Sequence, residues 1–205
     1  KFVIAIDSGI QSGVYKNLDH NFLEELKQNI NVIPFKRNFR NPRVLARRAC
    51  SIVSLPKPVT ARMLPSPPVV VSTIDEADLL NNLNIHLKQL LDKGVDVSDI
   101  TILTFKNRKN TILRYQKSIA GKHLLDMKIN SAWLESKQSY LKWSTIPSFK
   151  GLENEYIIMI EADLEELDDW SSSVLYVAMT RAKTEFIYFG KKDLSVWRAL
   201  LNDGS

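Results

Sequence analysis

The chain has 205 residues, of which 44% are hydrophobic and 25% charged, as in a soluble globular protein of one domain or one domain and part of another. Its net charge of +5 favours anionic partners such as nucleic acid or nucleotide, although many basic domains bind neither. The single cysteine, Cys50, excludes an internal disulfide and fits a reducing, cytoplasmic compartment. The three scattered histidines lack metal-ligand spacing, and no apolar run reaches the ~20 residues of a membrane span.

The first third of the chain alternates strand patterns with helical patterns. The hydrophobic spacing predicts a strand, a helix, a strand and a helix, in that order, over Phe2–Ile6, 18–29, Asn31–Phe35 and 42–53. Asn41 is expected to cap the last of these helices, with Pro42 at its first helical position. Five prolines between Leu55 and Pro68 predict an irregular connector. The chain opens with Lys rather than Met, which indicates a piece of a longer protein.

The rest of the chain continues the alternation. Strands are predicted over 69–73, Asp99–Phe105, Trp143–Ile146, Glu155–Ile160 and Thr184–Gly190. Helices are predicted over 75–94, 107–121, 174–183 and 193–201. Asp75 can cap the first of these helices and Gly94 can close it. Alternating strands and helices, with continuous apolar strands, predict an α/β fold whose parallel sheet is covered on both faces. The acidic run Glu161–Asp169 is expected to be a solvated loop.

A short polar turn between two predicted strands, "PSFKGLEN", carries groups suited to a nucleotide. Gly151 permits a tight turn or close approach to a ligand, Lys150 is a point charge suited to phosphate, and Glu153 can accept hydrogen bonds from ribose hydroxyls. Spacing alone favours the alternative of a surface turn with a Lys–Glu pair. The chain contains no GxxxxGK[ST] loop, so any phosphate cradle of that kind has to come from outside it.

Two arginines stand at the ends of predicted elements. Arg40 lies where a strand passes to a helix, which in a parallel sheet is the carboxyl edge where ligands bind. The alternative is a basic surface corner, because Lys36, Arg37 and Arg43 are close by. Arg181 ends the apolar stretch "VLYVAMTRAK" and is either a helix-end charge or a phosphate contact.

Taken together, these segments resemble a known family. "NFRNPRVLARRA", "TIPSFKGLENEYIIMI" and "LYVAMTRAKTEFIYF" occur in the order of motifs IV, V and VI of the UvrD/Rep-like superfamily 1 DNA helicases, in the second RecA-like domain. "FVIAIDSGIQSGVY" resembles motif III of the first RecA-like domain. The resemblance covers roughly residues 1–52 and 69–200. It implies that 1–16 end the first RecA-like domain and that 17–205 form a second RecA-like, P-loop NTPase-type domain without its own Walker A loop.

The resemblance also implies a nucleotide site. ATP and Mg²⁺ would lie between two RecA-like domains, held mainly by a first domain that is absent here. Arg181 would be the arginine finger and Arg40 a second contact to the γ-phosphate, together stabilising charge on the transferred group. Further nucleotide contacts are implied for Gln11, Lys150, Gly151 and Glu153. The isolated chain is expected not to hydrolyse ATP, and its partners would be the first RecA-like domain and single-stranded DNA.

The DNA track is implied by the same motifs. Thr145, Ser148 and Phe149 would contact single-stranded DNA, and Tyr176 would pack the motif VI helix. Base-stacking candidates, with core packing as the alternative, are Trp133, Trp143, Phe39 and Phe149.

The chain departs from the family pattern at three places. Pro147 replaces a common histidine, Asp7 and Gln11 are one residue further apart than expected, and "DDWSSS" replaces a Glu–Arg pair. About a hundred residues separate Arg40 from Thr145, which leaves little room for an inserted domain and predicts a compact member. The alternative function is a degenerate helicase-like module that binds nucleic acid or protein without catalysis.

Overall fold

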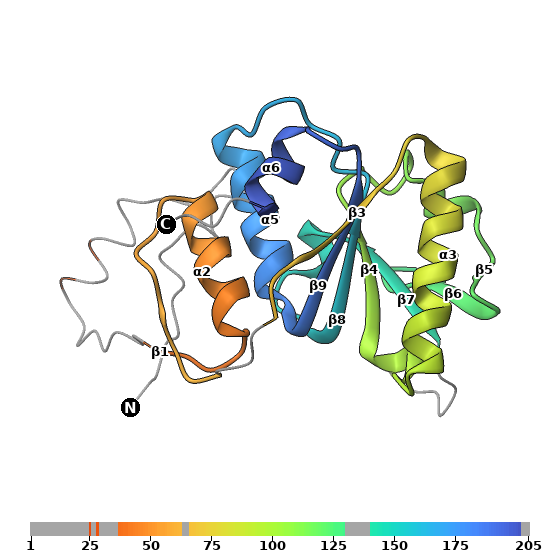
Figure 1. The fold of residues 1–205 in the computed structure, drawn as a ribbon, viewed down its shortest axis with the longest axis horizontal. Helices are drawn as coiled ribbons and strands as arrows, with labels where there is room; N and C mark the ends of the chain where they lie inside the picture. The colour runs from red at the N-terminus through yellow and green to blue at the C-terminus, as the bar shows by residue number, and fades with distance from the viewer. Residues whose placement is uncertain (1–24, 26–27, 29–36, 63–65, 130–139, 202–205) are drawn as a thin grey trace.

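The computed structural model describes residues 37–62, 66–129 and 140–201, together with Glu25 and Gln28, which are helical. It contains a seven-stranded sheet in the order β3-β9-β8-β4-β7-β6-β5 (Figure 1). The strands are β3 Val69–Ser72, β4 Ile100–Thr104, β5 Ser118–Ile119, β6 Lys122–Asp126, β7 Leu141–Thr145, β8 Asn154–Ile160 and β9 Ala182–Gly190. Every neighbouring pair is parallel except β5 and β6.

Helices cover both faces of this sheet. Among the described residues, α2 Arg43–Ile52, α5 Asp169–Thr180 and α6 Ser195–Leu201 lie on one face, and the long helix α3 Glu76–Asp92 lies on the other (Figure 1). Short 3₁₀ turns are η2 Val97–Asp99, η3 Ile112–Tyr115 and η4 Pro147–Phe149, and a two-residue ladder joins β1 Arg37–Asn38 to β2 Val59–Thr60. The α/β sheet covered on both faces is therefore confirmed. Within the described residues, no helix is long and apolar enough to cross a membrane.

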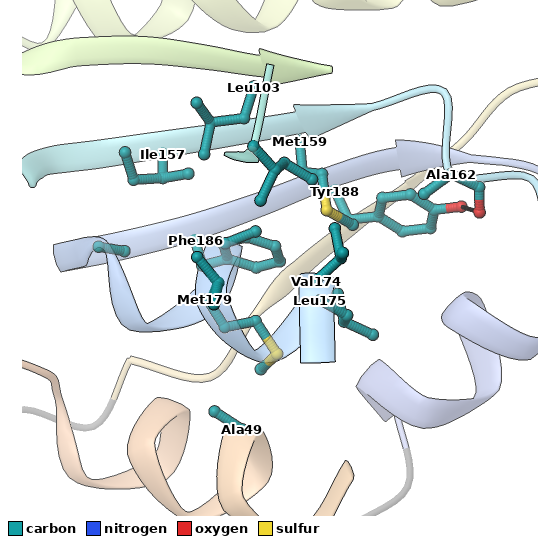
Figure 2. Packing of buried hydrophobic residues seen from close by; sticks show 14 of the residues in the cluster. Ala49, Leu103, Ile157, Met159, Ala162, Val174, Leu175, Met179, Phe186 and Tyr188 are labelled. Atoms are coloured by element: carbon teal, nitrogen blue, oxygen red, sulfur yellow. Dashed lines mark hydrogen bonds between the residues drawn. The ribbon is translucent and has the colours of Figure 1, made fainter. Parts of the chain in front are cut away.

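Side chains alternate between two cores because successive residues of a strand point to opposite faces. Ile157 and Met159 of β8 and Phe186 and Tyr188 of β9 pack toward α5 (Figure 2), and the residues between them pack toward α3. Each such buried side chain contributes about 1.5–3 kcal/mol. The Tyr188 hydroxyl donates to the carbonyl oxygen of Ala162 at 3.0 Å, and burial raises the pKa of Tyr188, so the hydroxyl keeps its proton.

The helix predicted over 107–121 is wrong. The Thr111 side chain accepts from the backbone N–H of Leu113 and starts only the short turn η3. Ala120 and Gly121 then adopt φ of 52° and 72°, as in the two-residue turn of a β-hairpin, and this turn joins β5 to β6. Gly121 therefore ends a hairpin turn, not a helix.

The start of α3 agrees with the sequence, whereas α5 begins at Asp169 rather than at 174 and α6 begins at Ser195 rather than at 193. The Asp75 side chain accepts from Asp78 N and caps α3, and Gly94 follows this helix with φ of 84°. In contrast, α2 begins at Arg43 with Pro42 as its N-cap, one residue later than predicted, because the Asn41 side chain is used elsewhere. The "DDWSSS" segment starts α5, where Asp168 and Ser171 form a capping box.

The acidic run is not uniformly solvated. Glu161 is buried at the carboxyl end of β8 and has φ of 63°. Its carboxylate accepts hydrogen bonds from Thr104 Oγ1 at 2.5 Å, Thr111 Oγ1 at 2.6 Å and Ile112 N at 3.0 Å. A buried carboxylate thus fixes the chain that follows β4. The strands predicted before residue 37, the helix between them and the 1–16 boundary lie outside the described residues.

Candidate functional site

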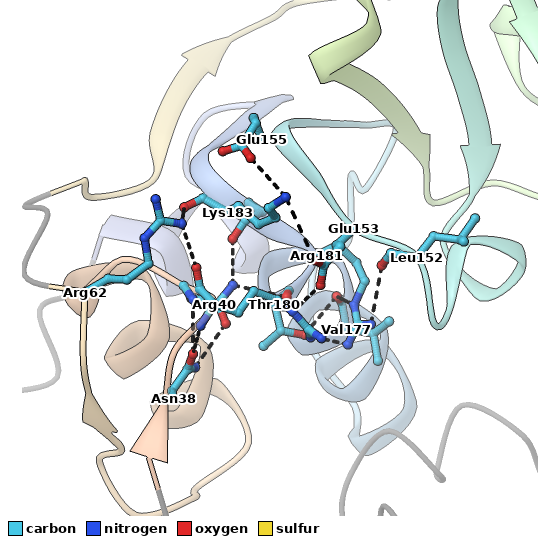
Figure 3. Close-up of polar contacts among 12 residues, drawn as sticks. Asn38, Arg40, Arg62, Leu152, Glu153, Glu155, Val177, Thr180, Arg181 and Lys183 are labelled. Carbon is cyan, nitrogen blue, oxygen red and sulfur yellow. Dashed lines mark hydrogen bonds and ion pairs between the residues drawn. The ribbon is translucent and has the colours of Figure 1, made fainter. Parts of the chain in front are cut away.

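The amino ends of β8 and β9 bring together two of the predicted nucleotide-binding residues. Glu153 directly precedes β8 and Arg181 directly precedes β9. Arg40, which lies just before α2, reaches the same edge, where its Nε is 2.5 Å from Glu153 Oε2 (Figure 3). Sequence reasoning placed Arg40 at the carboxyl edge of the sheet, and this is wrong. Its ion pair holds it at the amino edge of β8.

Arg181 is buried rather than on an open face. It is the C-cap of α5 and is 2% exposed. Its Nε donates to Val177 O at 3.2 Å, its Nη2 to Thr180 Oγ1 at 3.3 Å and its Nη1 to Leu152 O at 3.5 Å (Figure 3). The expectation that the Arg181 guanidinium lies on an exposed face is therefore wrong. Its hydrogen bonds to the carbonyl oxygens of Val177 in α5 and of Leu152 in the turn before β8 hold it in the interior. The apolar residues before it, from Val174 to Met179, are largely buried as predicted, and Tyr176 packs against the core.

Asn41 ties the Arg40 segment to the Arg181 segment. Its Nδ2 donates to Thr180 O at 3.1 Å and to Ala182 O at 2.6 Å, the two carbonyls on either side of Arg181. Its Oδ1 accepts from Asn38 at 3.0 Å. Asn41 is 2% exposed, so these bonds take the place of hydrogen bonds to water. They hold the segments that carry Arg40 and Arg181 in a fixed position relative to each other. Sequence reasoning missed this role and treated Asn41 as a helix cap.

A second ion pair borders the site at the start of β9. Lys183 Nζ lies 3.0 Å from Glu155 and 3.9 Å from Glu153. The Thr184 hydroxyl, which donates to Glu155 at 2.6 Å, lowers the pKa of Glu155, and Lys183 lowers it further. The Arg62 guanidinium donates to the carbonyl oxygens of Lys183 and Arg40. Nothing in the spacing of the sequence indicated Arg62 or Lys183.

The turn that carries Lys150 and Gly151 has the predicted conformation. Gly151 has φ of 88°, and a Cβ there would meet nothing within 4 Å, so the glycine serves the backbone conformation and not a close packing contact. Lys150 is half-buried and ends η4, three residues before Glu153. The tight turn at Gly151 is confirmed, and the phosphate role of Lys150 stays a prediction.

The proposed DNA-contacting residues lie at the opposite edge of the sheet. Thr145 is the last residue of β7 and pairs in register with Thr104 of β4. Thr104 in turn pairs with Ile160, at the carboxyl end of β8. The Thr145 hydroxyl donates to the Ser148 hydroxyl at 2.9 Å. Ser148 is exposed and lines a hollow of about 350 Å³ with Met127, Lys128, Ser144 and Leu152. The segment from Thr145 to Glu153 therefore connects the carboxyl edge of the sheet to the amino edge.

Two of the stacking candidates are core residues. Phe149 is 2% exposed in the cluster beneath α5, and Trp143 is 4% exposed in the cluster beneath α3. The DNA-binding assignment of Phe149 is therefore wrong, since its ring fills the space between the sheet and the helix. Phe39 is 67% exposed next to Arg40. Trp133 and Gln11 lie outside the described residues.

The described residues contain no group of three or more His, Cys, Asp and Glu side chains that could hold a metal ion. Cys50 is buried in α2, as expected for a small core thiol, and burial raises the pKa of that thiol.

Comparison with known proteins finds matches among solved structures. No protein-family profile and no curated protein matches the chain. Among solved structures, the chain is similar to the C-terminal domain of a possible DNA helicase from Lactobacillus plantarum WCFS1, with 16% identity and a TM-score of 0.61. The match covers 80% of this chain and 94% of that domain. The described sheet and its flanking helices therefore have the fold of that helicase C-terminal domain.

Proposed function

We propose that the chain is the C-terminal motor domain of an ATP-dependent DNA helicase or translocase of the UvrD/Rep-like type. The observation that carries the proposal is the edge cluster of Arg40, Glu153 and Arg181, drawn from three distant segments that resemble motifs IV, V and VI. The fold that the chain shares with a domain described as part of a possible DNA helicase supports it.

ATP would be the substrate, bound between this edge and a first RecA-like domain that carries the phosphate loop and Mg²⁺ ligands. The cationic side chains fit a polyphosphate, since Arg40 and Lys183 are both part-exposed and converge on Glu153. When phosphate oxygens approach, Arg40 can exchange its carboxylate partner for them, which frees Glu153 to accept from ribose hydroxyls. Lys150, in the same turn as Glu153, would approach the phosphates. Gly151 would permit the backbone to come close to the nucleotide.

Arg181 would act as the arginine finger after changing its partners. Its bonds to Val177 O, Thr180 Oγ1 and Leu152 O are 3.2 to 3.5 Å long, longer than charge-assisted contacts to an anion, which are typically ~2.7–2.9 Å. Transfer of the guanidinium to a phosphoryl oxygen would replace weak bonds with stronger ones. This would stabilise charge on the transferred γ-phosphoryl, the role of arginine fingers in phosphoryl transfer.

The contacts to single-stranded DNA would lie at the other, carboxyl edge of the sheet. Thr145 and Ser148 would contact the backbone of single-stranded DNA, and the turn from Thr145 to Glu153 would connect this contact to the nucleotide edge. Pro147 has no backbone donor, so the chain would rely on the two hydroxyls there. Gln11 would sense the γ-phosphate from the first domain.

A second candidate function is favoured by one observation. Glu153 and Glu155 already partner Arg40 and Lys183, and Arg181 is buried, an arrangement that also suits a non-catalytic module that binds nucleic acid or protein. The two functions differ in whether the arginines ever contact a nucleotide.

The deciding experiment compares ATP turnover and ATP binding in the longer protein that contains this chain. Arg181→Ala should lower kcat by about 10³-fold with only a modest loss of ATP binding, whereas Arg47→Ala, an exposed arginine of α2, should change neither. The 205-residue chain alone should show no steady turnover, because it lacks the phosphate loop. Near-normal kcat in the Arg181→Ala protein would refute the finger role, and absence of turnover in the unmutated protein would favour the binding module.

A further inference from the structure

Positive charge is concentrated in one segment of the chain. Residues 106–128 contain seven Lys and Arg side chains and a single acidic residue, Asp126, while the whole chain carries only +5. The remainder of the chain is therefore close to neutral. The segment comprises the loop after β4, the turn η3 and the hairpin β5–β6 at the end of the sheet.

The segment is held rigidly by its apolar residues. Ile112, Leu113, Ile119 and Leu124 are buried in the core beneath α3. Asn84 of α3 accepts a hydrogen bond from Ala120 N at 2.8 Å in the hairpin turn. The basic side chains therefore project from a fixed scaffold, which lowers the entropic cost of ordering them on a ligand.

Most of these cations face solvent without a carboxylate partner in the described part of the chain. Arg108 forms a two-bond pair with Asp126, at 2.7 and 2.9 Å, and Lys106 lies 3.4 Å from Glu161 and 3.5 Å from Glu76. Among the described residues, no salt bridge to a carboxylate involves the exposed side chains Lys109, Arg114, Lys117, Lys122 and Lys128.

An aromatic ring lies among these charges. Tyr115 is 73% exposed, and the Arg114 guanidinium lies over its ring at 4.8 Å from the centroid. Arg114 also donates to the carbonyl oxygen of Lys109 at 2.6 Å, so these three residues form one local group. An exposed ring among unneutralised cations is the combination that binds bases by stacking and phosphates by charge.

We propose that this edge of the sheet is a second binding surface for single-stranded nucleic acid. We call it the basic hairpin surface and define it as Lys109, Arg114, Tyr115, Lys117 and Lys122. The four cations contact backbone phosphates and the Tyr115 ring stacks on a base. A base must be unpaired to reach that ring, so the occupant is a single strand and not a duplex.

The surface is distinct from the contact assigned to Thr145 and Ser148. In the sheet order, β5 lies two strands beyond β7. Lys128, just after β6, lines the same hollow as Ser148 and so lies between the two regions. A nucleic-acid strand that contacts Ser148 can continue past Lys128 to the basic hairpin surface. Binding there requires no nucleotide and does not depend on the motor function proposed above.

The test is binding of a fluorescent single-stranded oligonucleotide of about 20 bases, long enough for one to several sites of this kind, to the 205-residue chain. Fluorescence anisotropy is measured across roughly 50–200 mM salt. The triple variant Lys109→Ala, Lys117→Ala, Lys122→Ala should bind at least about 10-fold more weakly, and its salt slope should fall by about 2, since each phosphate contact on a single strand contributes about 0.7. Tyr115→Ala should weaken binding by about 5-fold or more.

The matched control removes the same charge elsewhere. Lys57→Ala, Lys88→Ala, Lys93→Ala replaces three exposed lysines outside the segment and should leave affinity and salt slope within about 2-fold of the unmutated chain. Equal losses in the two triple variants would overturn the proposal, because net charge alone would then explain binding. A duplex bound as tightly as the single strand, together with an unaffected Tyr115→Ala protein, would overturn the assignment of a single strand. Equally tight binding of polyglutamate would reassign the surface to an acidic protein partner.

Discussion

Replacement of the buried carboxylate at Glu161 should destabilise the domain more than any surface change. In the Glu161→Ala protein, the hydroxyls of Thr104 and Thr111 and the amide of Ile112 lose the acceptor that they now share. Each buried donor left without a partner costs about 1–3 kcal/mol, so three of them give at least about 3 kcal/mol. The pair with Lys106, whose side chain is 41% exposed, adds little to this sum. A loss of this size is a large fraction of the 5–15 kcal/mol that is typical of a domain.

Two further variants separate the carboxylate from the backbone strain. Glu161→Gln keeps the shape but loses the charge, and should cost about 1–2 kcal/mol. Glu161→Gly removes the same bonds as alanine but relieves the positive φ of 63°, so it should be more stable than Glu161→Ala by about 1 kcal/mol.

The assay is equilibrium urea unfolding followed by tryptophan fluorescence and circular dichroism, with the free energy of unfolding extrapolated to water. Thr111→Val in a double-mutant cycle isolates the hydroxyl contribution. A Glu161→Ala protein less than about 1 kcal/mol weaker than the parent would refute the reasoning. Equal stability of the alanine and glycine variants would refute the strain component.

Two other predictions concern stability. Leu83→Ala removes a fully buried side chain of α3 and should lower the free energy of unfolding by about 2–5 kcal/mol. Ile85→Ala changes a side chain of the same helix that is 45% exposed and should lower it by less than about 0.5 kcal/mol. Similar losses for the two variants in urea unfolding would contradict the assigned helix face. Glu155 has a pKa lowered below its ordinary 4.5 by Thr184 and Lys183, so its charged form stabilises the fold above pH 4.5, and this contribution is lost as the pH falls through the lowered pKa. The stability difference between the unmutated chain and Glu155→Gln should therefore shrink as the pH falls below about 4.5, and a difference that grows in acid would show that the sign is wrong.

The sheet was predictable because its strands are apolar on both faces. Runs such as Ile157–Ile160 can only be buried between two layers of helices, and this fixed the α/β class without any long-range information. The capping of α3 by Asp75 was equally predictable, since an N-cap is a local interaction. These parts depend on the properties of neighbouring residues, which the sequence displays directly.

The missed features depend on partners far away in the chain. Gly121 is compatible with the end of a helix or with a hairpin turn, and only the packing of Ile119 and Leu124 beneath α3 decides between them. Glu161 belongs to an acidic run, and its burial follows from hydroxyls some 50 residues earlier. Arg181 was identified from its motif, but its inward orientation depends on the carbonyl of Leu152.

The Asn41 contacts also bear on the order of folding. They join residues that are 139 and 141 positions apart, a separation that makes the loop-closure entropy large and favours late formation. The neighbouring strands β8 and β9 are much closer in sequence, so their pairing closes a shorter loop and can form earlier. The arrangement of Arg40 beside Arg181 should then be acquired in the last steps of folding, so that a partly folded chain would already have its sheet but would not yet display the cationic edge.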